Sequence, residues 1–406
     1  MNSQPHNIRI IKLLTFLMFM MFAMTTDAVG EIIPVIMKEY DVSMTAAGLM
    51  HYTPMVAIAL AGAFLGFLAD KLGRKITIIL GLAIFAVNSY LYIIANTFGF
   101  ILSLMAIGGL SIGVFKTGAL AVIGDISTST KEHTSTMNNV EGFFALGAIF
   151  GPTLVKYFLS RGVVWSWLYV VAGSLCVILI IMALLVDYPA HNKAKADPVS
   201  LGQTLSLLKD PFSWGFSIGE FLYVAAECAV YVWMPTLILK YEGDLAFIAT
   251  SALPIFFILR AGGRFLGAWM MSRFDWTFVL AIFSFLIMIC FIGSVAGDIE
   301  LAVILLPLSG LFMSVIYPTL NSKGISCYPK VRHGSIAGVF LFFTAAGAAL
   351  GPLSMAVVSD AFGGNAVYGF ILATIFAALL FIGAVLNFIF KPTRNRLQLL
   401  DKTEYL

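Results

Sequence analysis

Long apolar runs alternate with short polar breaks along nearly the whole chain. A helix that crosses a bilayer core of about 30 Å needs about 20 mainly apolar residues. The first run is too long for a signal-peptide core and lacks a small-residue cleavage pattern, so we expect it to be retained. The pattern predicts an all-α polytopic membrane protein with twelve transmembrane helices. The predicted spans are residues 10–37, 46–69, 76–96, 99–126, 135–160, 164–187, 212–240, 246–271, 276–296, 300–326, 333–359 and 364–390.

The polar segments divide and orient these spans. If the N-terminus is cytoplasmic, seventeen of the 24 Lys and Arg residues fall in segments on that side or near the span ends that face it, and four fall correspondingly on the outer side. Short cytoplasmic loops carry such an excess of positive charge, so both termini are predicted to be cytoplasmic. The predicted organisation is an N-terminal six-helix bundle (1–187), a cytoplasmic linker (188–211), a C-terminal six-helix bundle (212–391) and a cytoplasmic tail (392–406).

The two halves resemble each other in sequence. The stretch FFALGAIFGP ends at Pro152 and FFTAAGAALGP ends at Pro352, and their Gly147 and Gly347 lie 200 residues apart. A repeat of six helices at this period predicts two bundles related by a pseudo-twofold axis along the membrane normal. Transporters with parallel repeats are built in this way, with a binding site at the repeat interface.

Composition excludes several other classes of protein. The chain is 60% hydrophobic and 11% charged, with a mean hydropathy of +0.97, whereas soluble domains carry about 25% charged residues. We find no nucleotide-binding loop, metal-ligand spacing or nucleophile arrangement. We therefore expect a non-enzymatic monomer with no cofactor or nucleic-acid partner, embedded in the bilayer and driven by an ion gradient. A sensor or scaffold role is disfavoured because the chain has no soluble signalling segment.

The segment GFLADKLGRK, residues 66–75, follows the second span. It resembles the loop signature of the major facilitator superfamily at each fixed position. The resemblance implies a conformational latch of the outward-open state, in which an acid accepts hydrogen bonds from a helix N-terminus or an arginine. The predicted latch residues are Gly66, Asp70, Gly73, Arg74 and Lys75. The second half has Met271 where the acid would fall, so the latch is predicted to be asymmetric.

Three further stretches resemble the fucose/glucose-type sugar:proton symporter group of that superfamily. They are FLYVAAECAV (221–230), GRFLGAWMMSRF (263–274) and GLFMSVIYPTL (310–320). The chain departs from the group in the fourth span. There Gly113 stands at a position that is often acidic, and Thr117-Gly118 replaces an Asn-Pro pair, with Lys116 beside it.

Six ionisable residues are predicted at membrane depth, where charges are expensive and usually functional. They are Asp27, Lys116, Glu220, Glu227, Arg260 and Arg264. The resemblance implies that the first, fourth, seventh and tenth helices line a central cavity. Asp27 and Glu227 occupy pseudo-equivalent positions of the two halves and are the predicted proton-coupling residues.

The predicted substrate-binding residues combine charged and aromatic side chains. They are Lys116, Arg264, Tyr317, Tyr223, Trp233 and Asn139. Two roles are open for Lys116, because it can neutralise Asp27 or bind an anionic group of the substrate. Arg264 can likewise bind an anion or pair with a glutamate of the seventh span.

These features favour proton-coupled uptake of a sugar or a sugar-derived metabolite, neutral or anionic, by alternating access across a bacterial inner membrane. The alternative is a proton-driven efflux antiporter for drugs or metabolites, since GAIFGP in the fifth span partly resembles the antiporter signature of exporters. Sodium is an alternative coupling ion. The choice between these functions is left open by the sequence.

Overall fold

The computed structural model describes residues 5–42, 44–189, 206–238, 241–363 and 365–404, and all regular structure in these ranges is helical. Most of the predicted linker, residues 190–205, lies outside the described residues. The helices are α1 (Pro5–Thr26), α2 (Val29–Tyr40), α3 (Met44–Leu65), α4 (Leu68–Lys71), α5 (Arg74–Leu91), η1 (Tyr92–Ile94), α6 (Phe98–Asp125), α7 (Thr130–Ser160), α8 (Trp167–Leu185), η3 (Leu207–Lys209), α10 (Pro211–Ile238), α11 (Ala246–Thr250), α12 (Ala252–Arg273), α13 (Trp276–Ala296), α14 (Ile299–Met313), α15 (Ile316–Ser326), η4 (Lys330–Arg332), α16 (His333–Ala361), α17 (Ala366–Phe390) and α18 (Arg394–Glu404).

The apolar runs form the expected helices. Within the described residues, eleven helices are long and apolar enough to cross a membrane, and Leu49–Leu65 is a shorter apolar helix. Each of these twelve segments coincides with one predicted span. The all-α polytopic fold predicted from the sequence is therefore confirmed.

Two predicted spans are interrupted well inside the apolar run, whereas the turns at Gly66-Phe67 and at Ser251 interrupt two others near one end. The first breaks between α1 and α2, at Asp27 and Ala28. Just before this break, the Thr25 hydroxyl donates to the Phe22 carbonyl, and the Thr26 hydroxyl lies within 3.2 Å of the same oxygen, so both can compete with backbone hydrogen bonds. The tenth span breaks between α14 and α15, four residues before Pro318, whose ring nitrogen cannot donate to the Ser314 carbonyl.

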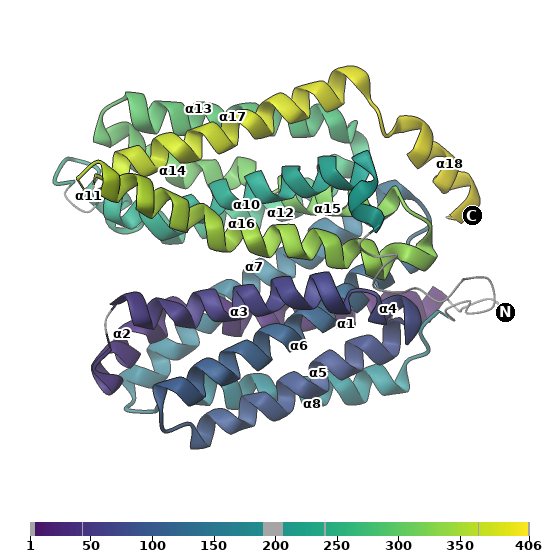
Figure 1. Ribbon diagram of the computed structural model, residues 1–406, viewed down its shortest axis with the longest axis horizontal. Coiled ribbons are helices and arrows are strands. Elements are labelled where there is room, and N and C mark those ends of the chain that lie inside the picture. Colours follow the sequence, from purple (N-terminus) through teal and green to yellow (C-terminus); the bar gives the residue numbers. More distant parts are fainter. Residues whose placement is uncertain (1–4, 43, 190–205, 239–240, 364, 405–406) are drawn as a thin grey trace. The chain divides into compact units, whose positions relative to one another are not determined.

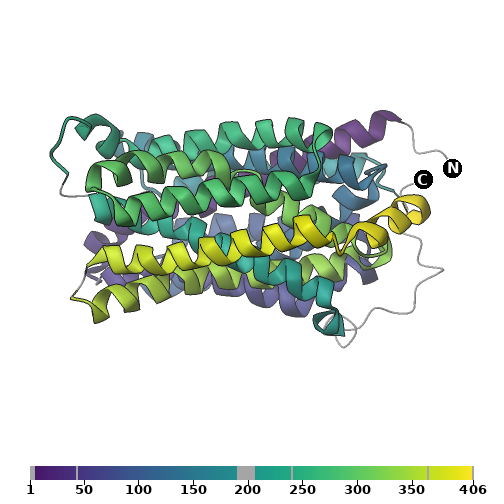
Figure 2. The ribbon, with the colours of Figure 1, turned by 90° about the horizontal axis from the view of Figure 1, so that it is seen from above.

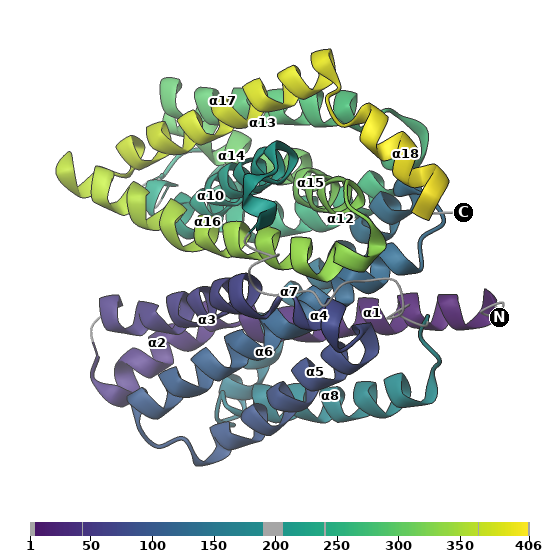
Figure 3. The same ribbon diagram turned by 45° about the vertical axis from the view of Figure 1, so that its right-hand side comes forward.

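The chain forms two compact units. Unit 1 comprises residues 1–127, 143–210 and 328–342, and unit 2 comprises residues 128–142, 211–327 and 343–406. In unit 1, α6 packs against α3 and α5, and α8 packs against α5 and α1 (Figures 1 and 3). In unit 2, α14 packs against α12 and α13, and α17 packs against α13 and α10. The helices α7 and α16 each contribute one segment to both units.

Close packing of α3 and α6 depends on glycine. A Cβ atom on Gly113 would lie 2.4 Å from the Ala61 Cβ, and one on Gly109 would lie 2.5 Å from the Pro54 carbonyl oxygen. Small residues allow membrane helices to approach closely in this way. An acidic side chain at position 113 therefore does not fit between these two helices, which explains why this chain departs from the symporter pattern there.

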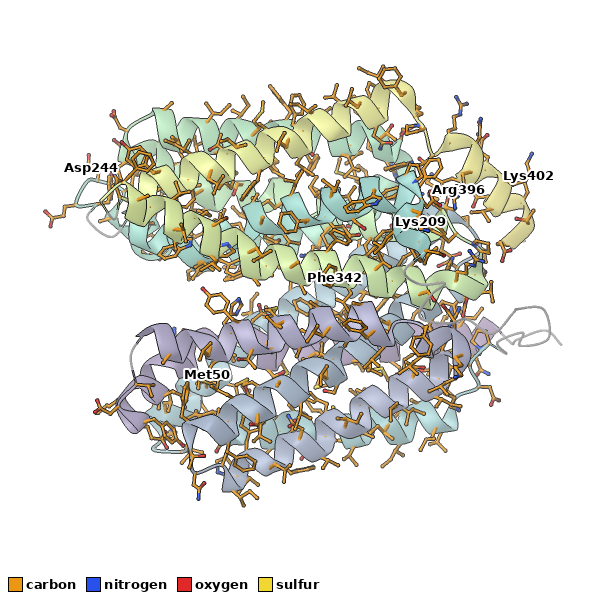
Figure 4. All side chains as sticks on the ribbon, in the orientation of Figure 1. Met50, Lys209, Asp244, Phe342, Arg396 and Lys402 are labelled. Carbon is orange, nitrogen blue, oxygen red and sulfur yellow. The ribbon has the colours of Figure 1, made fainter. Side chains whose placement is uncertain are left out.

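The predicted tail contains an ordered helix, α18, which turns away from the end of α17 (Figure 2). Arg396 and Lys402 project from it (Figure 4), while Leu397 and Leu400 are buried. Asp401 accepts hydrogen bonds from the backbone N–H of Thr130 at 2.9 Å and from its hydroxyl at 3.2 Å. The tail helix thereby caps the start of α7.

Candidate functional site

A buried group of charges in unit 1 centres on Asp70, whose side chain is 0% exposed. Its Oδ1 accepts hydrogen bonds from Arg74 Nη1 and from the Gly334 N–H at 2.9 Å. Its Oδ2 accepts from the N–H of Ser335 at 2.8 Å and from the Ser335 hydroxyl at 2.6 Å. Because Gly334 and Ser335 form the first turn of α16, the carboxylate also lies at the positive end of a helix dipole.

Arg74 completes this Asp70 cluster, which consists of Asp70, Arg74, Asp125 and the start of α16. Its Nε donates to Asp125 Oδ2 at 2.9 Å, Nη1 also reaches the Ala69 carbonyl, and Nη2 donates to the Lys330 carbonyl. All three guanidinium nitrogens are therefore used. Asp70, from the first half of the sequence, holds a helix from the second half through this network.

The other predicted latch residues contribute to the backbone around the cluster. Gly66 lies against Gly338, so that a Cβ on either residue would approach the other's Cα to within 2.9 Å. Gly73 has a positive φ of 96° at the turn before Arg74, a conformation that glycine adopts readily. Lys75 Nζ donates to the carbonyls of Leu184 and Val186 at the end of α8.

A second buried group lies in unit 2, at membrane depth. Glu227 Oε1 lies 2.7 Å from Arg260 Nε and also accepts a hydrogen bond from the Tyr223 hydroxyl. The same hydroxyl lies 2.9 Å from the carbonyl oxygen of Met313, the last residue of α14. A hydroxyl has one proton, so Tyr223 can donate to only one of these two acceptors at a time.

Arg264 extends this group from one turn further along α12. Its side chain is 0% exposed, and Nη1 lies 3.1 Å from Glu141 Oε2 of α7. Among the described residues, Nε and Nη2 have no hydrogen-bond partner. We call Glu141, Glu227, Arg260, Arg264 and Tyr223 the Arg264 cluster. Its arginine is a buried cation with unused donors, and such groups in native proteins call for an explanation.

Glu220, one of the six ionisable residues at membrane depth, lies in the same unit. It is fully buried, and its Oε2 accepts a hydrogen bond from the Thr344 hydroxyl at 2.8 Å. The buried Asn321 side chain also lies within hydrogen-bonding reach of the Glu220 carboxyl group.

The remaining predicted substrate-binding residues of unit 2 lie in different surroundings. Tyr317 is buried in α15, directly after the break in the tenth span. Trp233 Nε1 donates to the Pro352 carbonyl at 3.1 Å, a bond that joins α10 to α16. Asn139 is half-buried in α7, two residues before Glu141.

Asp27 and Lys116 belong to unit 1. Asp27 lies at the break of the first span. Its Oδ2 lies 3.0 Å from the Thr26 hydroxyl, which can donate its one proton either to Asp27 or to the Phe22 carbonyl. The Lys116 ammonium lies 5.1 Å from the ring centre of Phe144 and 6.0 Å from that of Phe19. Aromatic faces attract cations at such distances.

Glu141 was not among the predicted site residues. The fifth span was predicted to begin at residue 135, which put Glu141 near a helix end. In the structure α7 begins at Thr130, so eleven residues, about 16 Å of helix, precede Glu141. The STSTKEHTST stretch was the available signal, because hydroxyl residues commonly start helices. The described residues contain no group of three or more His, Cys, Asp or Glu that could hold a metal ion.

Broken membrane helices beside buried ion pairs are typical of secondary transporters. The sequence profile described as Major Facilitator Superfamily matches residues 15–352. The chain therefore belongs to the Major Facilitator Superfamily and is a multi-pass membrane transporter rather than an enzyme.

Individual relatives support this assignment. The L-fucose-proton symporter of Escherichia coli is 29% identical over 344 residues, which cover 73% of this chain and 75% of the symporter. The quinolone resistance protein NorA of Staphylococcus aureus is 26% identical over 204 residues, 47% of this chain and 52% of that protein. The crystal structure of the transporter FucP has a TM-score of 0.78 at 24% identity and covers 94% of this chain and 99% of its own.

Proposed function

We propose that this transporter takes up a sugar or a sugar-derived metabolite together with protons across a bacterial inner membrane, with both termini in the cytoplasm. Transport proceeds by alternating access of two six-helix bundles, residues 1–187 and 212–391. The similarity to a protein named as an L-fucose-proton symporter supports the substrate class and the coupling ion.

The observation that carries the proposal is the unused hydrogen-bonding capacity of the Arg264 cluster. A buried guanidinium with free N–H donors is costly unless a ligand completes it during the transport cycle. Sugar hydroxyls and carboxylates both accept such donors. Lys116, Tyr317, Tyr223, Trp233 and Asn139 are the further substrate contacts that we propose.

Asp27 and Glu227 are the proposed proton carriers. When Glu227 is ionised, it accepts hydrogen bonds and pairs with Arg260. When it is protonated, it can donate to the Tyr223 oxygen, and Tyr223 then donates to the Met313 carbonyl. Proton binding would therefore release Arg260 from its carboxylate partner and couple protonation to the arginines of α12.

A second candidate function is proton-driven efflux of drugs or metabolites. The similarity to NorA, a quinolone resistance protein, favours it, although that similarity covers only about half of each chain. Efflux would use the same latch and the same buried carboxylates. The two functions differ in the substrate and in the direction of its net movement.

The test is counterflow in proteoliposomes that contain the purified chain, with a panel of sugars, sugar acids and organic acids. We expect at least one sugar or sugar acid to exchange, and an imposed inward proton gradient to drive its accumulation. The Asp27→Asn variant should lose accumulation but keep exchange, because exchange requires no net proton release. Exchange restricted to hydrophobic drugs would instead favour efflux.

A further inference from the structure

Unit 2 contains a cavity of about 670 Å³ among α10, α13, α15 and α17. This volume falls within the range of about 300–1,000 Å³ that is usual for ligand sites. Gly215 of α10 and Gly383 of α17 both line it, and a Cβ atom on either glycine would meet nothing within 4 Å. We call this cavity the α10–α17 groove.

The wall of the groove does not suit a polar transport substrate. Its lining side chains are apolar except for Ser284, Asn387 and Thr393. A sugar placed there would lose hydrogen bonds to water without replacing them. Because the four lining helices are membrane-spanning segments, the ligand that suits this wall is a hydrocarbon chain from the bilayer.

One end of the groove is bordered by basic residues. Phe390, Pro392 and Thr393 line it, and Lys391 and Arg394 lie between and directly after them in the chain. Lys391 Nζ lies 3.1 Å from Asp275 Oδ2, and an ammonium group with three donors can bind a phosphate beside that carboxylate, while Arg394 is exposed. These positions complement the charge of a phosphate at the membrane surface, where each basic residue contributes about 1 kcal/mol of attraction to anionic lipid.

A further contact and a backbone angle describe the structure of this basic end. The guanidinium of Arg396 lies 4.8 Å from the ring centre of Phe212, another lining residue. Lys391 has a positive φ of 44°, where a glycine would be cheaper. The turn therefore places a cation directly beside the groove in a backbone conformation that ordinarily favours glycine.

We propose that the α10–α17 groove binds one acyl chain of an anionic glycerophospholipid, with the lipid phosphate at Lys391 and Arg394. The site is separate from the Arg264 cluster, and the proposal holds whichever substrate the transporter carries. The bound lipid fills the space between α10 and α17 that the two glycines leave.

Native mass spectrometry of the full-length chain, titrated with phosphatidylglycerol or phosphatidylcholine of identical acyl chains, tests this proposal. We expect the first phosphatidylglycerol to bind at least ten-fold more tightly than phosphatidylcholine. The double change Lys391→Gln and Arg394→Gln should reduce that preference to less than three-fold, whereas Lys402→Gln on the same tail should not. Equal binding of the two lipids by the unchanged protein would overturn the proposal.

A groove-filling variant separates this site from general lipid contact. Gly383→Leu should weaken the binding of both lipids ten-fold or more. Gly99→Leu is the matched control, since Gly99 is an exposed glycine of unit 1 with equally open surroundings. Binding by Gly383→Leu that matches the unchanged protein would contradict the acyl-chain site.

A third measurement needs no variant and therefore does not depend on the folding of one. Phosphatidylglycerol with a photoactivatable acyl chain should crosslink mainly to residues 211–222 and 379–390. Crosslinks spread evenly over all helices would overturn the proposal. Crosslinking between two chains at this groove would also overturn it and would identify a second copy as the occupant.

Discussion

The Asp70 cluster of unit 1 and the Arg264 cluster of unit 2 are both buried groups of charges, but they differ in how far their hydrogen bonds are satisfied. Both oxygens of Asp70 and all three nitrogens of Arg74 have partners. Arg264 has one carboxylate oxygen near Nη1 and no partner at Nε or Nη2 among the described residues. A network in which every donor and acceptor is paired stabilises one arrangement of the backbone. A network with unpaired donors can still form hydrogen bonds to a ligand.

This difference separates a structural role from a binding role without reference to sequence motifs. In the Asp70 cluster, Asp70 and Arg74 both bond to backbone groups as well as to each other, and Arg74 also pairs with Asp125. The Arg264 cluster consists of side chains from α7, α10 and α12. Substitutions in the first cluster should therefore change conformation and stability, and those in the second should change substrate binding.

The largest effect is expected from Arg264→Leu, which removes the buried guanidinium. The variant loses two charge-assisted hydrogen bonds to the substrate and leaves Glu141 unpaired. Together these losses cost about 3–5 kcal/mol of binding free energy. Counterflow of the transported substrate should fall by about 100-fold or more. Arg273→Leu, an exposed arginine at the end of the same helix that lies over Trp269, should transport normally. Transport by Arg264→Leu within a few-fold of the unchanged protein would remove Arg264 from the binding site.

Asp70→Asn should have the next largest effect, on conformation rather than affinity. The substitution weakens the bonds to Arg74 and to the start of α16, a loss of about 1.5–3 kcal/mol for hydrogen bonds to a charged group. The population of inward-open molecules should rise by about 10- to 100-fold. Paired spin labels at the exposed Lys71 and Lys131 report this as a longer distance. An unchanged distance distribution would show that Asp70 is not a latch.

Lys116 tests whether unit 1 also contributes to binding. If it binds an anionic group, Lys116→Ala should weaken binding of an anionic substrate by about ten-fold and leave a neutral analogue unaffected. If it neutralises Asp27 instead, the single change should impair coupling, and the pair Asp27→Asn and Lys116→Ala should fold better than either alone. Isothermal titration and vesicle pH measurements distinguish these results. A Lys116→Leu protein that binds and accumulates its substrate normally would contradict both roles.

The fold followed from the sequence to a greater extent than the site. Apolar length determines which segments cross a membrane, so all twelve spans could be located. The breaks at Asp27 and Ser314 could not be located in this way, because a broken helix and a straight one have the same hydropathy. Their causes are local: the Thr25 and Thr26 hydroxyls that bond the backbone, and the missing N–H of Pro318.

The site residues show a corresponding limit. The cost of burying charge identified Arg264 and Glu227 as exceptional residues, but it could not identify their partners. Arg264 was expected to bind an anion or to pair with a glutamate of the seventh span, and its proximity to Glu141 of α7 was not predicted. That pairing depends on which helices are neighbours in space, and neither periodicity nor charge spacing in one chain specifies this. The α18 helix was not predicted either. The burial of Leu397 and Leu400 stabilises it, and that burial depends on which segments are neighbours in space.

The smallest effect is expected at a third pair, Asp275 and Lys391, which is partly exposed and so contrasts with both buried clusters. Asp275 caps α13 by accepting hydrogen bonds from the Thr277 N–H and hydroxyl. Partial burial raises the pKa of Asp275, but these hydrogen bonds and Lys391 outweigh it and leave the pKa below its ordinary value. The stabilisation is therefore present above the unfolded pKa of about 3.9 and is lost as the pH falls through the lower folded value.

The measurement for this pair is the melting temperature of Asp275→Ala in detergent as a function of pH. Because the Asp275 side chain is 49% exposed, solvent screening limits the expected loss to about 1 kcal/mol at pH 7, mostly from the cap. The difference in Tm from the unchanged protein should shrink below about pH 4, where the carboxylate becomes protonated. Asp298→Ala is the matched control, because Asp298 precedes α14 at the same N-cap position without a side-chain cap hydrogen bond. An equal loss of Tm in both variants, independent of pH, would mean that helix propensity rather than the ionised cap determines the effect.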